Sequence, residues 1–390
     1  MEFKNRAREL RDYTIGLRRM FHQYPEASLK EFETRKMIEA ELSKFSIPYE
    51  IVGETGLVAR IKGKGPGKTV ALRADIDALE LDDLKEVDYK SKTPGLNHAC
   101  GHDGHTAMLI TAGRILQENK DKFDGEIILI FQPAEELISG AKKMLAEKNF
   151  LQGVDSILGI HLISTLEVGK LGYCYGASLS SADSFVINLQ GKGGHGASPH
   201  DSIDPLVAAC ALVTDAQSIV SREISPRDFG VLTFGIVQAG SRHNIIPDSA
   251  LIEGTIRTYD NEVQRTMKEA LSRIVQSISK AYRVQAHLEF PVQTLPVVNT
   301  GSHVDFARKT MERLVGPDWV EEQPPSTGSE DFSFFLEKAP GLYLQVGAGN
   351  DTNAIYPHHH PKFDIDEDSL EIGTALYCQY AVDFIENFPL

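Results

Sequence analysis

The 390-residue sequence has only four cysteines and no apolar run long enough to cross a membrane. The cysteines (Cys100, Cys174, Cys210 and Cys378) lie far apart and form no C-x-x-C pair, which indicates a reducing compartment and argues against a disulfide framework. The N-terminal segment MEFKNRARELRDYTIGLRRMF mixes charges throughout and lacks the apolar stretch of a signal peptide. We therefore expect a cytoplasmic protein with no membrane partner.

Positive charge is also scarce, because 40 Lys and Arg residues face 55 Asp and Glu residues, for a formal net charge of −15. Nucleic acids and anionic membranes attract clustered Lys and Arg, so this balance argues against both as main partners. It does not exclude a small anion bound locally. Apolar residues make up 42% of the chain, enough for a sizeable core, and the length suits two domains better than one.

Continuous apolar strands alternate with helical patterns in the first part of the chain. Strands are expected at 69–75, 126–131 and 156–160, with helices at 105–117 and 139–148 between them. Residues 1 to about 45 have amphipathic helical spacing that breaks near Pro25. This order indicates an α/β domain whose sheet is covered by helices on both faces.

The pattern changes near residue 180. From there to about 292 the order is β-α-β-β-α-β, the split ferredoxin-like unit, with a helix opened by Asp204 and Pro205. Helix and strand signals then resume, ending in a helix near 367–385. We predict one α/β domain formed by residues 1–179 and 294–390, interrupted by an inserted α+β domain at 180–293.

The segment NHACGHDGHTA places three imidazoles and a thiol in a Gly-containing loop just before a helix. Histidine and cysteine are ligands suited to Zn, Co, Mn or Ni. This density favours a metal site over a chance cluster. Spacing alone does not choose among His98, His102 and His105, and Cys100 can act with either neighbouring histidine.

Further candidates follow the predicted strands. Glu135 and Glu136 come after the strand at 126–131, so that one carboxylate can bind metal while the other acts as a general base. His161 follows the strand at 156–160, and Asp75 ends the strand at 69–75. The carboxyl ends of strands in an open α/β sheet are where sites form, and convergence of unrelated residues there by chance is a poor explanation.

Three more segments carry candidate groups. YPHHHPKF adds His358, His359 and His360 near the C-terminus, and GKGGHGASPH surrounds His195 with glycines that let backbone approach a ligand. In the inserted domain, Asn244 offers an amide, and Arg257 a guanidinium suited to a substrate carboxylate.

The motifs HACGHDGHTA, QPAEE, GKGGHGASPH, GTIRTYD, GSEDF and HHPKFD, in this order, resemble those of the binuclear metallohydrolases of the aminoacylase and glutamate-carboxypeptidase group. The chain is most similar to their amidohydrolase branch, which includes hippurate hydrolases, auxin-conjugate hydrolases and N-acetyldiaminopimelate deacetylases. The resemblance implies a zinc-peptidase-like catalytic domain with a mixed sheet, and an inserted lid that also dimerises. It implies two divalent ions per subunit (Zn, Mn, Co or Ni) and a homodimer or larger homo-oligomer.

The resemblance also implies residue roles. Glu135 matches the general base, and Asp75 at most supports a ligand. His195 matches a catalytic group that reaches in from the lid of a partner subunit. The implied metal ligands are Cys100, His102, Glu136, His161 and His359, with His358 the nearest rival of His359. The substrate carboxylate would be held by Asn244 and Arg257, with backbone amides near Thr327 and Gly328.

The resulting hypothesis is a metal-dependent amidohydrolase that cleaves N-acyl amino acids. The main alternative is a dipeptidase or aminopeptidase-like metallopeptidase that acts on short peptides at the same site. A metal-dependent binding protein is a third possibility, although it would not need Glu135 beside its metals. A cysteine-nucleophile amidase that uses Cys100 is the fourth, and it would remain active in the presence of a chelator.

Overall fold

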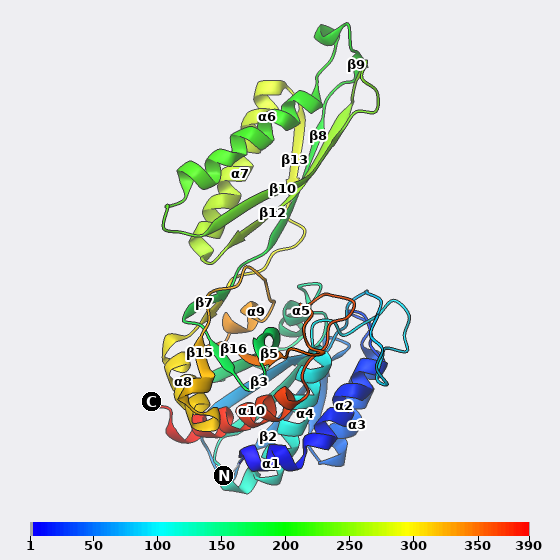
Figure 1. The fold of residues 1–390 in the computed structure, drawn as a ribbon. Coiled ribbons are helices and arrows are strands. Elements are labelled where there is room, and N and C mark those ends of the chain that lie inside the picture. Colours follow the sequence, from blue (N-terminus) through cyan, green and yellow to red (C-terminus); the bar gives the residue numbers. More distant parts are fainter. Residues whose placement is uncertain (1–2, 390) are drawn as a thin grey trace. The chain divides into compact units, whose positions relative to one another are not determined.

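The structure is a computed structural model that describes residues 3–389, and it divides into two compact units. Unit 1 contains the chain up to Gly176, Val298–Pro324 and the chain from Asp331 onwards. Unit 2 contains Ala177–Val297 and the short segment Pro325–Glu330. Figure 1 shows both units coloured along the chain.

Unit 1 is built on a mixed eight-stranded sheet in the order β1-β2-β4-β3-β5-β16-β6-β15. Adjacent strands are parallel within the run β4-β3-β5-β16 and in the pair β6-β15, whereas the pairs β1-β2, β2-β4 and β16-β6 are antiparallel. The strands are β1 (Tyr49–Val52), β2 (Gly56–Lys62), β3 (Thr69–Asp75), β4 (Glu126–Gln132), β5 (Ser156–Glu167), β6 (Leu171–Tyr173), β15 (Val320–Glu322) and β16 (Gly341–Gly349).

Successive side chains along the central strands point alternately to the two faces of this sheet. On β3, Val70 and Leu72 point into the main core under helices α4 and α10, while Arg73 points to the other face and lies over the ring of Phe332 beside α9. The helices are α1 (Phe3–Glu9), α2 (Arg11–Gln23), α3 (Phe32–Lys44), α4 (His102–Glu118), α5 (Gly140–Glu147), α8 (Gly301–Val315), α9 (Ser333–Leu336) and α10 (Asp368–Asn387). Helices therefore cover both faces, which confirms the predicted α/β class.

Unit 2 has the predicted order of elements around an antiparallel sheet, β10-β12-β8-β13. Its core lies between this sheet and two helices. Asp204 caps α6 as expected, because its side chain accepts hydrogen bonds from the backbone N–H groups of Leu206 and Val207. The elements are β8 (Asp183–Gln190), β9 (Gly194–His195), α6 (Pro205–Ser218), β10 (Gly230–Ala239), β11 (Ile245–Ile246), β12 (Ser249–Thr258), α7 (Asn261–Tyr282) and β13 (Gln285–Glu289).

The segment 325–330 departs from the sequence prediction, which placed it with the catalytic domain. It belongs to unit 2, where the backbone N–H of Ser180 donates a hydrogen bond to the carbonyl of Gly328 and Ser326 forms an isolated parallel β-bridge with Leu179. Two short strands, β7 (Gly176–Leu179) and β14 (Val297–Asn299), lie where the chain passes between the units. No helix among residues 3–389 has the length and apolar character needed to cross a membrane.

Candidate metal centre

The site forms at the edge of the unit 1 sheet where parallel strands end. Strand β3 ends at Asp75 and β4 at Gln132, with Glu135 and Glu136 in the turn that follows. His161 lies within β5, which extends past the predicted end at residue 160. The loop with Cys100 leads into α4 at His102. Since β3 pairs in parallel with both β4 and β5, the residues at their carboxyl ends meet on one edge.

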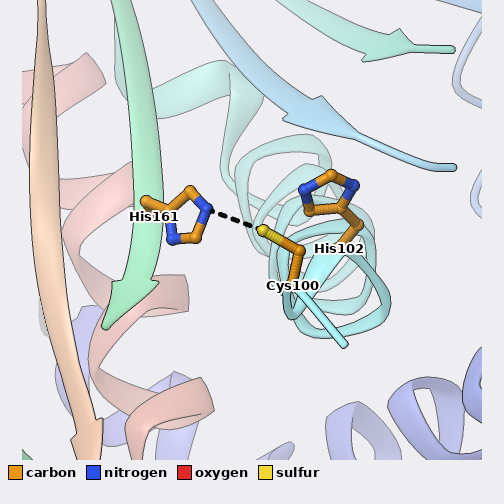
Figure 2. A group of neighbouring side chains, drawn as sticks. All are labelled: Cys100, His102 and His161. Atoms are coloured by element: carbon orange, nitrogen blue, oxygen red, sulfur yellow. Dashed lines mark hydrogen bonds between the residues drawn. The ribbon is translucent and has the colours of Figure 1, made fainter. Parts of the chain in front are cut away.

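Side chains from four segments converge there with ligand atoms within 4.8 Å of one another. Three groups of potential ligands share members there: Cys100, His102 and His161; Cys100, Glu136 and His359; and His102, Glu135 and Glu136. Figure 2 shows the first group, in which the Cys100 sulfur lies 3.5 Å from Nε2 of His161. Because Cys100, His102 and Glu136 each belong to two groups, the three groups form one continuous cluster.

The two histidines of Figure 2 are oriented by backbone and carboxylate acceptors. Nδ1 of His161 donates to the carbonyl of Leu162 at 2.8 Å, which leaves Nε2 facing Cys100. Burial, with His105 and His358 nearby, holds the pKa of His161 well below its usual value, so the ring stays neutral. Nδ1 of His102 contacts the carbonyl oxygen of Asp77 at 3.0 Å and its carboxylate at 3.3 Å. Each ring thus presents Nε2 to the cluster, as metal-binding histidines do.

Asp77 also lies at this site, although the sequence pattern did not single it out. Its carboxylate contacts His102 and accepts hydrogen bonds from the backbone N–H of Glu136 at 3.1 Å and from the hydroxyl of Ser28 at 2.7 Å. It therefore holds two candidate ligands in place. The signal that could have found it is spacing, because Asp75 and Asp77 are two residues apart at a strand end.

Asp75 is fully buried and supports the site from another direction. Its carboxylate contacts Nδ1 of His105 and Nη1 of Arg73, both at 2.6 Å. Burial opposes its charge, but His102, Arg73 and His105 outweigh burial and hold the pKa of Asp75 well below its usual range. His105 accepts the backbone N–H of Leu162 on Nε2 at 2.9 Å, so both of its ring nitrogens are occupied.

Two residues at the cluster have left-handed backbone, which is uncommon for side chains other than glycine. Ala134 has φ 51° in the turn that carries Glu135 and Glu136, and His359 has φ 64°. The backbone N–H of His359 donates to the carbonyl of Ala99 at 2.8 Å, which joins the segment of His359 to the segment of Cys100. Strain of this kind persists where surrounding contacts fix a functional geometry.

The donor set fits a divalent cation. Nε2 of His102 and Oε1 of Glu136 are buried without a hydrogen-bond partner among the described residues. Burial raises the pKa of the Cys100 thiol, and the nearby Cys100 sulfur and Glu136 carboxylate raise the pKa of His359 to about 10. Thiolate, imidazole and carboxylate are zinc-type ligands, and metal binding to such groups releases protons.

Other sequence candidates lie outside the convergent groups. His358 donates from Nε2 to the carbonyl of Leu162 at 2.8 Å. His98 is buried beside the ring of His22, 6.3 Å away between ring centroids, and is in none of the groups. The ring of His360 stacks on Tyr356.

The remaining candidates all belong to unit 2, where they form two sets. His195 pairs with Ile245 in the β9–β11 ladder, and the carbonyl of Asn244 accepts the N–H of Gly196 at 2.9 Å. Elsewhere in the unit, Nη1 of Arg257 donates to the carbonyl of Thr327 at 3.1 Å, next to Gly328. The catalytic and substrate-binding roles of these residues stay predictions.

A mixed sheet with thiol, imidazole and carboxylate donors at its carboxyl edge is typical of metal-dependent hydrolases of the zinc-peptidase kind. Residues 71–383 match the sequence profile of peptidase family M20/M25/M40, and the chain belongs to this family, in its amidohydrolase branch. It is a metal-dependent hydrolase that acts on amide bonds.

Several characterised relatives are similar over nearly the whole chain. Thermostable carboxypeptidase 2 of Saccharolobus solfataricus is 40% identical over 98% of this chain and 98% of its own length. N-acetyl-L-cysteine deacetylase of Bacillus subtilis is 39% identical over 91% and 84%, and IAA-amino acid hydrolase ILR1-like 2 of Arabidopsis thaliana is 39% identical over 97% and 87%. The crystal structure of Bacillus subtilis YXEP, described as a dinuclear metal binding peptidase from the M20 family, superposes with a TM-score of 0.84 at 33% identity, covering 97% of this chain and 99% of that one.

Proposed function

We propose that the protein hydrolyses the amide bond of N-acyl amino acids, with two divalent cations (Zn, Mn, Co or Ni) held by Cys100, His102, Glu136, His161 and His359. The observation that supports this most strongly is the convergence of these five side chains from four segments, with Glu135 next to His102 and Glu136. When bound, the cations would lower the pKa of a water and polarise the substrate carbonyl.

In this reaction Glu135 would move the proton. Glu135 is 7% exposed, and its carboxylate would accept a proton from the attacking water and give it to the nitrogen of the leaving amine. His195 would donate a hydrogen bond to the developing oxyanion, either in the same chain or from a partner subunit's lid. Arg257 and Asn244, with backbone amides near Thr327 and Gly328, would bind the substrate carboxylate.

Substitution of Glu135 by glutamine tests the proton transfer. The amide keeps the size of the side chain but takes up no proton, so kcat should fall by about 10²–10⁴-fold. Metal content, measured by elemental analysis, should stay unchanged. Glu337→Gln, an exposed site beyond α9, is the matched control and should keep full activity. Retention of wild-type turnover in Glu135→Gln would refute the assigned role.

The relatives narrow the substrate class. An N-acetyl-L-cysteine deacetylase, an IAA-amino acid hydrolase and a carboxypeptidase share a scissile amide whose nitrogen belongs to an amino acid with a free carboxylate. We infer that this carboxylate, more than the acyl group, is the common recognition element here. The competing function, hydrolysis of dipeptides or short peptides at the same site, is favoured by the 40% identity to thermostable carboxypeptidases.

A substrate panel separates these functions. N-acetyl amino acids, the same compounds with the carboxylate converted to an amide, and simple dipeptides are compared by kcat/KM. We expect the free-carboxylate N-acetyl compounds to be cleaved fastest, and the amidated ones at least about tenfold more slowly, because loss of a charge-assisted hydrogen bond costs about 1.5–3 kcal/mol. Faster cleavage of dipeptides would assign the protein to the peptidase alternative.

We also propose that unit 2 mediates a homodimer or larger homo-oligomer. Strand β10 is at the edge of the sheet, and several exposed apolar side chains lie on unit 2. They include Leu206, Val207, Val220, Ile236, Val237 and Ile245. An open edge strand with apolar side chains is a surface that soluble proteins usually cover.

A further inference from the structure

Arg18 of helix α2 is a fully buried cation near the candidate metal centre. Its guanidinium has 0% side-chain exposure, and each of its three nitrogens contacts a carboxylate. Nε lies 2.9 Å from Asp103, Nη2 2.7 Å from Asp364 and Nη1 3.3 Å from Glu367. Only the planar fork of an arginine can engage three acceptors in this way.

The carboxylates belong to the two segments that carry candidate ligands. Asp103 directly follows His102, and Asp364 is five residues after His359. Arg18 therefore joins the start of α4 to the segment that leads into α10. Asp364 is also held by the hydroxyl of Tyr89 at 2.8 Å.

His22, one helical turn later, adds a connection between the start of α4 and the loop that precedes Cys100. Its Nδ1 lies 2.6 Å from Asp103, and its Nε2 lies 3.2 Å from Asp83 in the loop that precedes Cys100. Residues four apart share a face of a helix, so α2 presents Arg18 and His22 together to this region. All of these residues lie within unit 1.

A purely stabilising role does not account well for this arrangement. Burial of a cation among carboxylates carries a large desolvation cost, and apolar side chains of similar volume stabilise a core as well or better. What the ion pairs add is a defined geometry between two chain segments. Arg18 also lies outside residues 71–383, the part of the chain that matches the family profile.

We propose that Arg18 is a positioning residue that fixes the Cys100–His102 segment relative to the His359 segment, so that ligands from both can bind the same pair of cations. The proposal rests on the two-metal site described above. It assigns to an N-terminal helix a role in metal affinity, although that helix contributes no ligand.

The test is Co²⁺ binding to metal-free protein, since Co²⁺ has visible absorption bands and a thiolate-to-cobalt band that reports on Cys100. Dissociation constants come from competition with an indicator chelator. Arg18→Lys keeps the positive charge but loses the planar guanidinium that contacts three carboxylates, whereas Arg18→Met removes both the charge and the guanidinium. We expect each to weaken Co²⁺ binding by about 10–100-fold, the range for residues that orient metal ligands, and to alter the absorption spectrum.

Arg19→Met is the matched control. Arg19 is the next residue of the same helix, is 47% exposed and pairs with Glu367, so its loss should change Co²⁺ affinity by less than about twofold. Thermal unfolding of the metal-free variants measures structural damage separately. If Arg18→Lys is less stable but binds Co²⁺ with wild-type affinity and spectrum, the role is merely structural and the proposal is overturned.

Asp364→Asn provides a second variant should the Arg18 variants fail to fold. It weakens only the connection to the His359 segment, and we expect about tenfold weaker Co²⁺ binding. Wild-type affinity in Asp364→Asn would also overturn the proposal. If the wild-type protein itself takes up no Co²⁺, the proposed two-metal function fails instead, and the two failures are thereby distinguished.

Discussion

At the scale of single residues, His98 has an unusual environment. It is 2% exposed, and neither ring nitrogen has a hydrogen-bond partner among residues 3–389. Burial lowers the pKa of His98 to about 3, against the opposing effect of Asp103. The ring is therefore neutral in the folded protein, whereas in the unfolded chain it gains a proton near pH 6.5.

This difference predicts a pH dependence of stability. Between about pH 6.5 and 3 the unfolded state binds more protons at His98 than the folded state does. The neutral His98 ring therefore contributes fully to the free energy of unfolding above pH 6.5. This contribution is lost as the pH falls, by up to about 1.4 kcal/mol per pH unit. In His98→Phe this loss should disappear. The measurement is urea unfolding of metal-free wild type and variant at pH 7, 6 and 5.

Fluorescence of the one tryptophan, Trp319, reports on unit 1 in this experiment, because Trp319 lies in that unit. The difference between the two proteins isolates His98 from the other histidines. Parallel stability curves for wild type and variant would show that His98 does not titrate as proposed.

Which residues carry the site was predictable in part from the sequence. The motif HACGHDGHTA contains many potential metal ligands, and Glu135, Glu136 and His161 follow or end predicted strands. Both features pointed to the region where the structure brings these side chains together. Spacing did not choose between His358 and His359, because that depends on the left-handed backbone at His359. Nor did it identify Asp77 or Arg18, whose roles depend on contacts between segments far apart in the chain.

At the scale of elements, buried strands were easier to predict than exposed or short ones. Strand β3 has the predicted bounds, because its run of apolar residues is buried on both faces. Strand β1 was missed, since its residues are mostly part-exposed and carry no clear period. Strand β5 continues past residue 160 through His161, where alternating exposure replaces the apolar run that marked its start.

The edge strand β10 leads to a prediction about assembly. Val237 is 48% exposed on this strand, and a charge there should oppose any contact made by the apolar surface of unit 2. We expect the wild-type protein to have at least twice the mass of one chain, and Val237→Glu to shift toward the monomer.

Size-exclusion chromatography with light scattering gives the masses. Gln285→Glu places the same charge on β13, the opposite edge of the same sheet, and should leave the mass unchanged. A wild-type protein that is monomeric at all concentrations, or equal dissociation in both variants, would contradict an interface at β10.

At the scale of the whole molecule, the candidate metal ligands belong to only one of the two units. The five candidate ligands belong to unit 1, which is assembled from three separate stretches of chain, and unit 2 has its own hydrophobic core. A ligand that binds only the folded state stabilises only the part of the protein whose unfolding releases it. Metal should therefore stabilise the two units to different extents.

Removal of metal by a chelator tests this difference by calorimetry, with Trp319 fluorescence to identify the transition of unit 1. A cation present at 100 times its Kd contributes about 2.7 kcal/mol, which for a unit of this size corresponds to a decrease of about 5–10 °C in Tm on chelation. The transition of unit 2 should move by less than about 2 °C, and restored Co²⁺ or Zn²⁺ should reverse the change in unit 1. If chelation moves both transitions equally, or neither of them, the cations do not bind where the five side chains converge.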